Sequence, residues 1–188
     1  LIFAPLSSKL QGQQNIYFYS FLGFWFLTVA HSSMRIAAPG FVYGLALLNL
    51  TYGKKNTFSA LCLIYSSLNY SFKYHQDHIH PKSFFYKRKL EELGITDNKI
   101  KEEYISKVNN ISNLQLLEAT TNIEKKDKPF EEWLHERFPN ENDRNNYLSL
   151  NHIKNNQSLK FDDFLNFYEQ RRLTLKKIYA DILNVKLE

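Results

Sequence analysis

The sequence predicts an α+β fold that is mostly α-helical. Apolar side chains recur every three or four residues along much of the second half of the chain, which is the spacing of one helix face. Residues 74–79 instead read as a strand, in which neighbouring side chains point to opposite faces. With 188 residues, the chain can bury a core as one domain, or as one domain with a helical appendage.

Residues 1–70 are aromatic and aliphatic with few charges. Two uncharged runs, 16–30 and 36–50, are each shorter than the roughly 20 apolar residues that a membrane-spanning helix needs. We therefore expect them to form buried helices that pack on each other and on the rest of the domain, without a membrane partner. Residues 58–68 are predicted to continue as a short apolar helix.

The charged part of the chain begins after the strand. Residues 84–93 predict a helix that ends at Gly94, because glycine commonly terminates helices. Thr96 is expected to cap a second helix that continues to Val108. Residues 82–108 therefore form a helical insertion, and we expect it to shape access to a site on the strand.

The last third of the chain is also predicted to be helical. Pro129 starts an amphipathic helix that ends near Phe138. Residues 140–157 are rich in asparagine and predict a polar connection with a short helix at 144–148. The final helix is expected to cover residues 161–183.

Arg171 and Arg172 interrupt the apolar stripe of this final helix, at positions where helical spacing predicts apolar side chains. In one interpretation, one arginine lies along apolar surface with its charge in water, and the other faces solvent. In the other interpretation, one guanidinium crosses toward a phosphate or an acidic partner near the strand.

The segment Asp77-His78-Ile79-His80-Pro81 is the best candidate for chemistry. Asp77 and His78 are neighbours on the predicted strand, so they would flank a site from two sides. A neutral imidazole, with a reference pKa of about 6.5, is a competent general base at neutral pH. Carboxylate oxygens suit Mg²⁺, and hydrolysis of a phosphodiester uses both functions. His80 is expected to share a face with His78, as a group that supports the site or as a third ligand, and we favour a nonessential role.

Two downstream segments extend this pattern: Asn113-Leu114-x-x-Leu117, and Asn122 followed three positions later by a lysine. Together the three segments resemble the His-Me finger (HNH) nucleases. In that family the first strand ends in Asp-His-Ile-x-Pro, an Asn-Leu-x-x-Leu segment forms the second strand, and Asn-x-x-Lys begins a helix. The asparagines are nine positions apart (122 − 113), a spacing that the resemblance favours.

The resemblance implies a ββα-metal finger, two short antiparallel strands plus a helix, embedded in the helical domain. His78 would be the general base, and Asn113 would be a second catalytic-site residue that orients the loop and His78 through backbone hydrogen bonds. Asp77 and Asn122 would hold Mg²⁺ or another divalent cation such as Mn²⁺. The phosphate-binding candidates are Lys82, Lys125, Lys126, Arg171 and Arg172. For the lysines at 125 and 126, a solvated helix face is the alternative.

The likeness covers roughly residues 72–183 and is to the C-terminal nuclease domain of GmrSD-type restriction proteins of bacteria. It implies DNA as the partner and restriction or phage defence as the setting. An N-terminal domain with an Asp-Gly-Gln-Gln-Arg motif handles nucleotides in those proteins. Residues 10–15 contain Gly-Gln-Gln without the acid or the arginine. We treat that match as chance, and we expect the nucleotide-handling domain to be missing from this chain.

On this interpretation the chain divides into three parts of one domain. Residues 1–70 form an apolar helical portion, residues 71–130 form the finger with its insertion, and residues 131–188 form C-terminal helices. Cleavage of both DNA strands by a one-site finger would need two copies or two events, which allows a homodimer.

Composition permits this interpretation without requiring it. The chain has 24 basic and 19 acidic residues and a net charge of +5, which suits phosphate binding only where the charges cluster. The single Cys62 excludes an internal disulfide and is typical of the cytoplasm. A zinc site of His75, His78 and His80 is disfavoured, because a strand places His75 on the opposite face. The alternative function is a noncatalytic nucleic-acid-binding or protein-docking module that keeps the finger as scaffold.

Overall fold

The computed structural model describes residues 44–65, 68–69 and 71–184. Within these residues the fold is α+β and mostly helical, with one two-stranded antiparallel sheet, as predicted. The predictions for 16–30 and for most of 36–50 lie outside the described residues. None of the described helices is both long enough and apolar enough to cross a membrane.

The sheet consists of β1 (Tyr74–His78) and β2 (Leu114–Glu118), which pair antiparallel. Asp77 lies opposite Gln115, and His78 lies opposite Leu114. Because side chains alternate along a strand, the Asp77–Gln115 pair and the His78–Leu114 pair lie on opposite faces. The first strand therefore separates the two residues of the predicted site as expected.

The helix α7 (Ala119–Lys125) follows β2 without a linker and contacts both strands. Between the strands lies the predicted helical insertion. It contains the 3₁₀ turn η1 (Lys82–Phe85), α5 (Lys87–Glu92) and α6 (Asn98–Lys107), and the 3₁₀ turn η2 (Ile111–Asn113) follows it and leads into β2. The helix α6 is capped by Asp97 and not by Thr96 as predicted, because the Asp97 carboxylate accepts hydrogen bonds from the first free backbone N–H groups.

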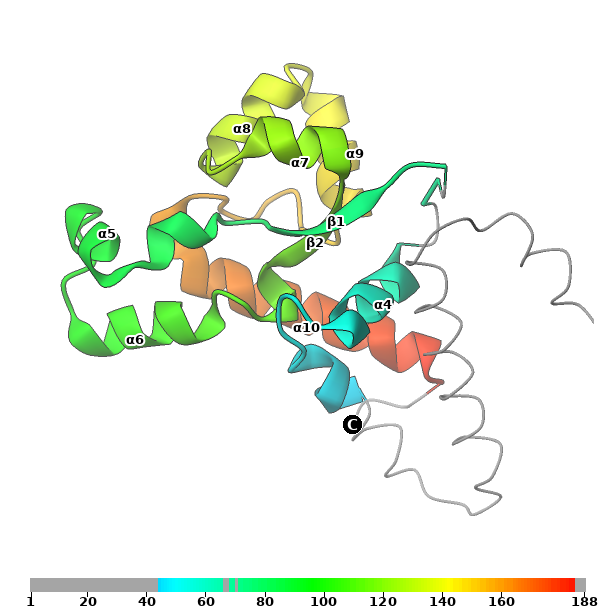
Figure 1. Cartoon of the computed structure of the whole chain (residues 1–188), viewed down its shortest axis with the longest axis horizontal. Coiled ribbons are helices and arrows are strands. Elements are labelled where there is room, and N and C mark those ends of the chain that lie inside the picture. The colour runs from blue at the N-terminus through cyan, green and yellow to red at the C-terminus, as the bar shows by residue number, and fades with distance from the viewer. Residues whose placement is uncertain (1–43, 66–67, 70, 185–188) are drawn as a thin grey trace, which may run out of the picture.

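The remaining helices cover the two sides of the sheet (Figure 1). On one side lie α7, α8 (Phe130–Arg137) and α9 (Glu141–Leu150). On the other side lie α4 (Lys55–Ile64) and α10 (Phe164–Ile182), which the 3₁₀ turn η3 (Phe161–Asp163) precedes. The helix α9 is longer than the predicted 144–148, because the Asn140 side chain caps it and extends its first turn.

Two apolar clusters hold the sheet in place. The first cluster joins the insertion to α8, α9 and the first half of α10, and includes Leu117, Phe164 and Phe167. The second cluster joins α4, the other face of the sheet and the second half of α10, where Leu175 and Tyr179 are buried. Since α10 contributes to both clusters, it is the common support of the sheet.

Candidate functional site

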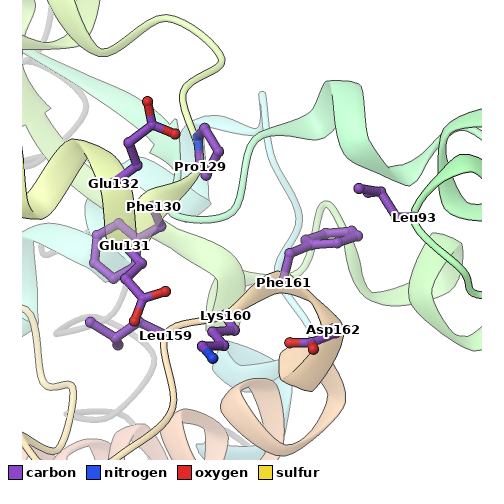
Figure 2. Close-up of a pocket in the computed structure, with 9 residues that line it drawn as sticks. All are labelled: Leu93, Pro129, Phe130, Glu131, Glu132, Leu159, Lys160, Phe161 and Asp162. Carbon is purple, nitrogen blue, oxygen red and sulfur yellow. The ribbon is translucent and has the colours of Figure 1, made fainter.

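A pocket of about 390 Å³ lies beside the start of α8, and none of the predicted site residues lines it (Figure 2). Its described lining includes the carboxylates of Glu131, Glu132 and Asp162 against the single ammonium of Lys160. Such a rim repels the phosphates of a nucleic acid. The sheet, which carries Asp77 and His78, is therefore the candidate site.

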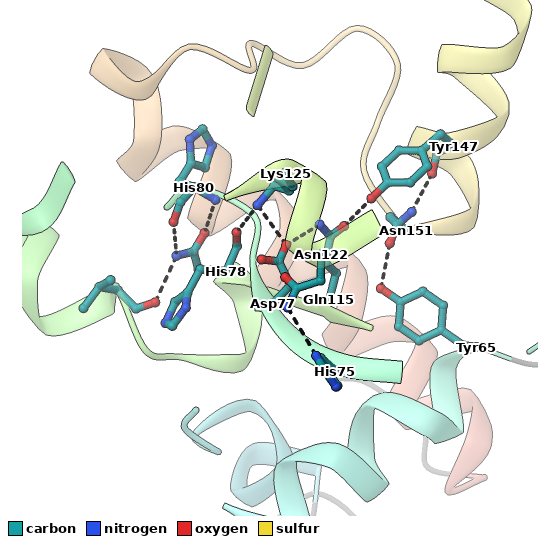
Figure 3. A network of polar contacts seen from close by, with 12 residues as sticks. Tyr65, His75, Asp77, His78, His80, Gln115, Asn122, Lys125, Tyr147 and Asn151 are labelled. Carbon is teal, nitrogen blue, oxygen red and sulfur yellow. Dashed lines mark hydrogen bonds and ion pairs between the residues drawn. The ribbon is translucent and has the colours of Figure 1, made fainter. Parts of the chain in front are cut away.

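Asp77 is the centre of a buried polar network on the α7 side of the sheet (Figure 3). Its Oδ2 accepts hydrogen bonds from Lys125 Nζ and Gln115 Nε2, both at 2.8 Å. Gln115 Oε1 accepts in turn from the Tyr147 hydroxyl at 2.7 Å. Among the described residues no hydrogen bond reaches Asp77 Oδ1. The carboxylate is thus fixed through one oxygen, Oδ2.

Lys125 lies inside the protein, with 0 % of its surface exposed. Besides the ion pair with Asp77, its ammonium donates to the His78 backbone oxygen at 2.6 Å and lies 5.8 Å from the Trp133 ring centre. Burial lowers the pKa of Lys125, and the neighbouring Asp77 carboxylate opposes that shift. Neither expectation for this side chain, a phosphate contact or a solvated helix face, is correct, because its donors bind Asp77 and the strand backbone.

The two arginines of α10 also bind the chain itself. Arg171 is fully buried and donates to the backbone oxygens of Ile111, Ser112 and Asn151. Arg172 is partly buried and donates to the Leu48 backbone oxygen and the Asn49 side chain. Arg171 does not lie at the surface as the other interpretation required, whereas Arg172 stays partly exposed. Arg171 instead supports η2, the turn that leads into β2.

Lys82 and Lys126 are the phosphate-binding candidates that remain exposed. Lys82 begins η1, four positions after His78 along the chain, and its charge helps to lower the pKa of that imidazole. Lys126 ends α7 in a left-handed backbone conformation, with φ of 51°. Of the two, Lys82 is the cation with an electrostatic effect on the His78 ring.

His78 occupies the other face of β1. Its Nε2 lies 3.0 Å from Asn109 Oδ1, and its ring lies against the Tyr52 ring, with centroids 4.4 Å apart. Burial lowers the pKa of His78 below its usual 6.5, although the Asn109 hydrogen bond acts in the opposite direction. The imidazole is therefore neutral at neutral pH, which a general base requires.

Asn113 makes backbone hydrogen bonds of the kind that the sequence predicts for it. Its Oδ1 accepts from the His80 N–H at 3.0 Å, and its Nδ2 donates to the backbone oxygens of His80 and Val108. The Asn113 backbone oxygen also accepts from the Ile79 N–H at 2.8 Å. The side chain is completely buried, so it positions the turn after His78 and does not contact a substrate.

His80 does not share a face with His78, because β1 ends at His78 and strand alternation stops there. Its ring is buried among four phenylalanines: Phe130, Phe161, Phe164 and Phe167. Burial lowers the pKa of His80 to about 3, and Nε2 has no hydrogen-bond partner among the described residues. His80 is therefore a neutral core residue, and the expectation of a shared face with His78 is wrong.

Asn122 contacts His75, with Nδ2 and Nδ1 3.4 Å apart. His75 lies on the Asp77 face of the strand, as alternation predicts. Consequently α7 reaches β1 at two points, through Asn122 at His75 and through Lys125 at Asp77. Within the described part of the chain, no hydrogen bond or ion pair joins Asn122 to Asp77 or His78.

Two side-chain oxygens on the Asp77 side of the sheet accept no hydrogen bond from a described residue. No cluster of three or more His, Cys, Asp or Glu side chains suited to a metal occurs among residues 44–65, 68–69 and 71–184. The available set is one carboxylate oxygen, Asp77 Oδ1, and one amide oxygen, Asn122 Oδ1, neither of which accepts a hydrogen bond from a described residue. Mg²⁺ prefers oxygen donors and keeps several waters, so two protein oxygens are compatible with it.

Sequence reasoning missed four residues that position the site: Tyr52, Asn109, Gln115 and Tyr147. The contact between Gln115 and Asp77 could have been predicted, because antiparallel pairing of the two strands places these residues opposite each other. The Asn109 and Tyr52 roles had no local signal, since they depend on a contact between segments far apart in the chain.

Fold and site together define an α+β domain in which a two-stranded sheet and one helix position a carboxylate and an imidazole on opposite faces of a strand. Comparison with models of known protein families finds no match, and a search of curated proteins finds no similar sequence.

Proposed function

We propose that this chain is a metal-dependent DNA endonuclease of the HNH type, the nuclease part of a bacterial restriction or phage-defence protein. One observation carries the proposal. The last residue of β1, His78, presents a neutral imidazole on one face of the strand. The residue before it, Asp77, presents a carboxylate on the opposite face, and the Oδ1 atom of this carboxylate accepts no hydrogen bond from a described residue. The helix that follows β2 adds the Asn122 amide on the Asp77 side.

Each residue then has a distinct task. His78 accepts the proton of the attacking water. Asp77 and Asn122 would hold the cation, Mg²⁺ or Mn²⁺, which would supply stabilisation of the charge that develops on the phosphate and on the departing oxygen. Asn113 keeps the turn after His78 in place through its backbone hydrogen bonds.

Replacing His78 with alanine tests the proposal. With the purified chain and supercoiled plasmid in Mg²⁺ or Mn²⁺, we expect His78→Ala to slow cleavage about 100-fold or more, the usual contribution of a general base. Exposed His135 on α8 provides the matched control, and His135→Ala should cleave like wild type. Circular dichroism confirms that both variants are folded.

Two outcomes would refute the assignment. One is plasmid cleavage by folded His78→Ala at the wild-type rate. The other is wild-type protein that binds DNA but cleaves it in none of several divalent metals, which would favour the noncatalytic binding or docking module.

Lys82→Ala is expected to weaken DNA binding while leaving the chemical step nearly intact. Exposed Lys82 begins the turn after the site, so its removal should raise KM several-fold and reduce the slope of log affinity against log salt by about 1. Binding is measured by fluorescence anisotropy at several salt concentrations. Lys99→Ala, on an exposed face of α6, is the control. Equal salt slopes for Lys82→Ala and wild type would remove Lys82 from the DNA-contact surface.

A further inference from the structure

A segment that precedes α4 is joined to the turn that enters β2. The Tyr52 N–H donates to the Asn109 backbone oxygen at 2.7 Å, and the Ile111 N–H donates to the Leu50 backbone oxygen at 2.9 Å. Thr51 and Asn110 form an isolated antiparallel bridge between these two hydrogen bonds. Tyr52 and Asn109 are therefore fixed next to each other by backbone contacts.

The same segment is joined to β1. The Gly53 N–H donates to Gln76 Oε1 at 2.9 Å, and Gln76 Nε2 donates to the Lys54 backbone oxygen at 3.1 Å. Gly53 has φ of 80°, a left-handed conformation that glycine adopts without strain. The turn at 52–54 is thus held against the face of β1 that carries His78.

These contacts bring two side chains onto one imidazole. Asn109 Oδ1 lies 3.0 Å from His78 Nε2, and the Tyr52 ring covers the imidazole at 4.4 Å and 33°. Tyr52 keeps 44 % of its surface exposed, whereas His78 keeps 9 %. The imidazole plane is therefore fixed by a hydrogen bond at one edge and by an aromatic ring on one face.

The hydrogen bond selects a tautomer. An amide oxygen only accepts, so Nε2 must carry the proton, and in a neutral ring the lone pair is then on Nδ1. No hydrogen bond from a described residue reaches Nδ1, and Nδ1 is not among the fully buried atoms that lack a partner. Nδ1 is the ring nitrogen that remains accessible to a water molecule.

We infer that Asn109 is a positioning residue of the site: it holds His78 as the Nε2–H tautomer, which leaves Nδ1 as the basic nitrogen, while Tyr52 keeps the ring in that orientation. The catalytic part of this inference rests on the proposed nuclease function. The hydrogen bond itself requires neither substrate nor metal, so it is measured separately.

Nitrogen-15 NMR of the histidine rings tests the tautomer in the metal-free full chain at pH 7.5. We expect a protonated Nε2 for His78, assigned by its absence in His78→Ala, with an N–H proton that is protected from exchange with water. In Asn109→Ala this proton should exchange too rapidly to be observed. Asn109→Asp should restore it, because a carboxylate also accepts.

Cleavage kinetics test the catalytic part. We expect Asn109→Ala to lower kcat about tenfold or more with KM within about twofold, and Asn109→Asp to recover most of kcat. The matched control is Asn110→Ala, since Asn110 caps η2 and binds the Leu48 backbone oxygen without reaching His78. Asn110→Ala should lower stability while His78 keeps its protonated Nε2.

The outcomes separate the two proposals. Protonated Nδ1 in a wild-type protein that cleaves DNA would overturn the positioning role alone, as would an unchanged Nε2–H signal and kcat in Asn109→Ala. Protonated Nε2 in a wild-type protein that cleaves nothing would refute the nuclease function, and with it the catalytic meaning of the tautomer.

Discussion

Replacing Lys125 with methionine is expected to lower the free energy of unfolding by about 3–5 kcal/mol, the usual cost of removing one partner from a buried ion pair. Lys125 is fully buried, and its ammonium is the cation that compensates the Asp77 carboxylate at 2.8 Å. Methionine fills a similar volume but leaves that carboxylate without its charge partner. It also leaves the His78 backbone oxygen without a donor that the wild type supplies at 2.6 Å.

Urea unfolding followed by circular dichroism measures this loss. Lys126→Met is the matched control, because Lys126 is exposed and its replacement should change stability by less than about 0.5 kcal/mol. Adding Asp77→Asn to Lys125→Met should recover at least about 1 kcal/mol, since the unpaired charge is removed. Equal stability of Lys125→Met and wild type would show that Asp77 does not depend on this ammonium.

His80→Leu is expected to remove much of the sensitivity of the protein to mild acid. The folded state holds His80 neutral with a pKa of about 3, whereas the unfolded chain takes up a proton near pH 6.5. Between these two pH values the unfolded state binds more protons, so stability is fully present above pH 6.5 and falls as the pH falls. From pH 7 to pH 5 this one residue should cost the wild type roughly 2 kcal/mol.

The test compares unfolding of wild type and His80→Leu at pH 7 and pH 5. Leucine has a similar volume and lacks the unpaired Nε2, so the two proteins should differ by less than about 1.5 kcal/mol at pH 7. Between pH 7 and pH 5 the free energy of unfolding should fall less for His80→Leu than for wild type. The control His135→Gln replaces an exposed histidine and should retain the wild-type pH dependence. If the free energy of unfolding fell equally in wild type and His80→Leu from pH 7 to pH 5, His80 would be protonated inside the folded protein.

Much of this fold is predictable from the sequence, because the spacing of apolar residues along the chain determines which segments form helices and strands. Strand alternation places Asp77 and His78 on opposite faces, and apolar spacing locates α8 and α10 to within a few residues. The boundaries are less exact: α4 covers Lys55–Ile64 and not 58–68, and α5 begins at Lys87 and not at residue 84. Asp97 rather than Thr96 caps α6, because its carboxylate reaches two backbone N–H groups.

The charge environment of the site could not be predicted in the same way. Lysine and arginine are usually exposed, yet Lys125 and Arg171 are fully buried because a carboxylate and a set of backbone oxygens bind them. Each of those partners comes from a distant part of the chain. The same limit applies to Asn109 and Tyr52, whose contact with His78 exists only after the strands and the preceding segment have assembled.

The support that α10 gives to both apolar clusters has a consequence for synthesis. Translation produces the two strands before α10, and at that stage both clusters lack the side chains that this helix contributes. The turn before β2 also lacks the Arg171 donors. Long-range strand pairing without that burial is too weak to persist. In a nascent chain without α10, Asn109 and Lys125 would therefore not stay bound to β1, and the proposed DNA-cutting activity would begin only after α10 had emerged from the ribosome.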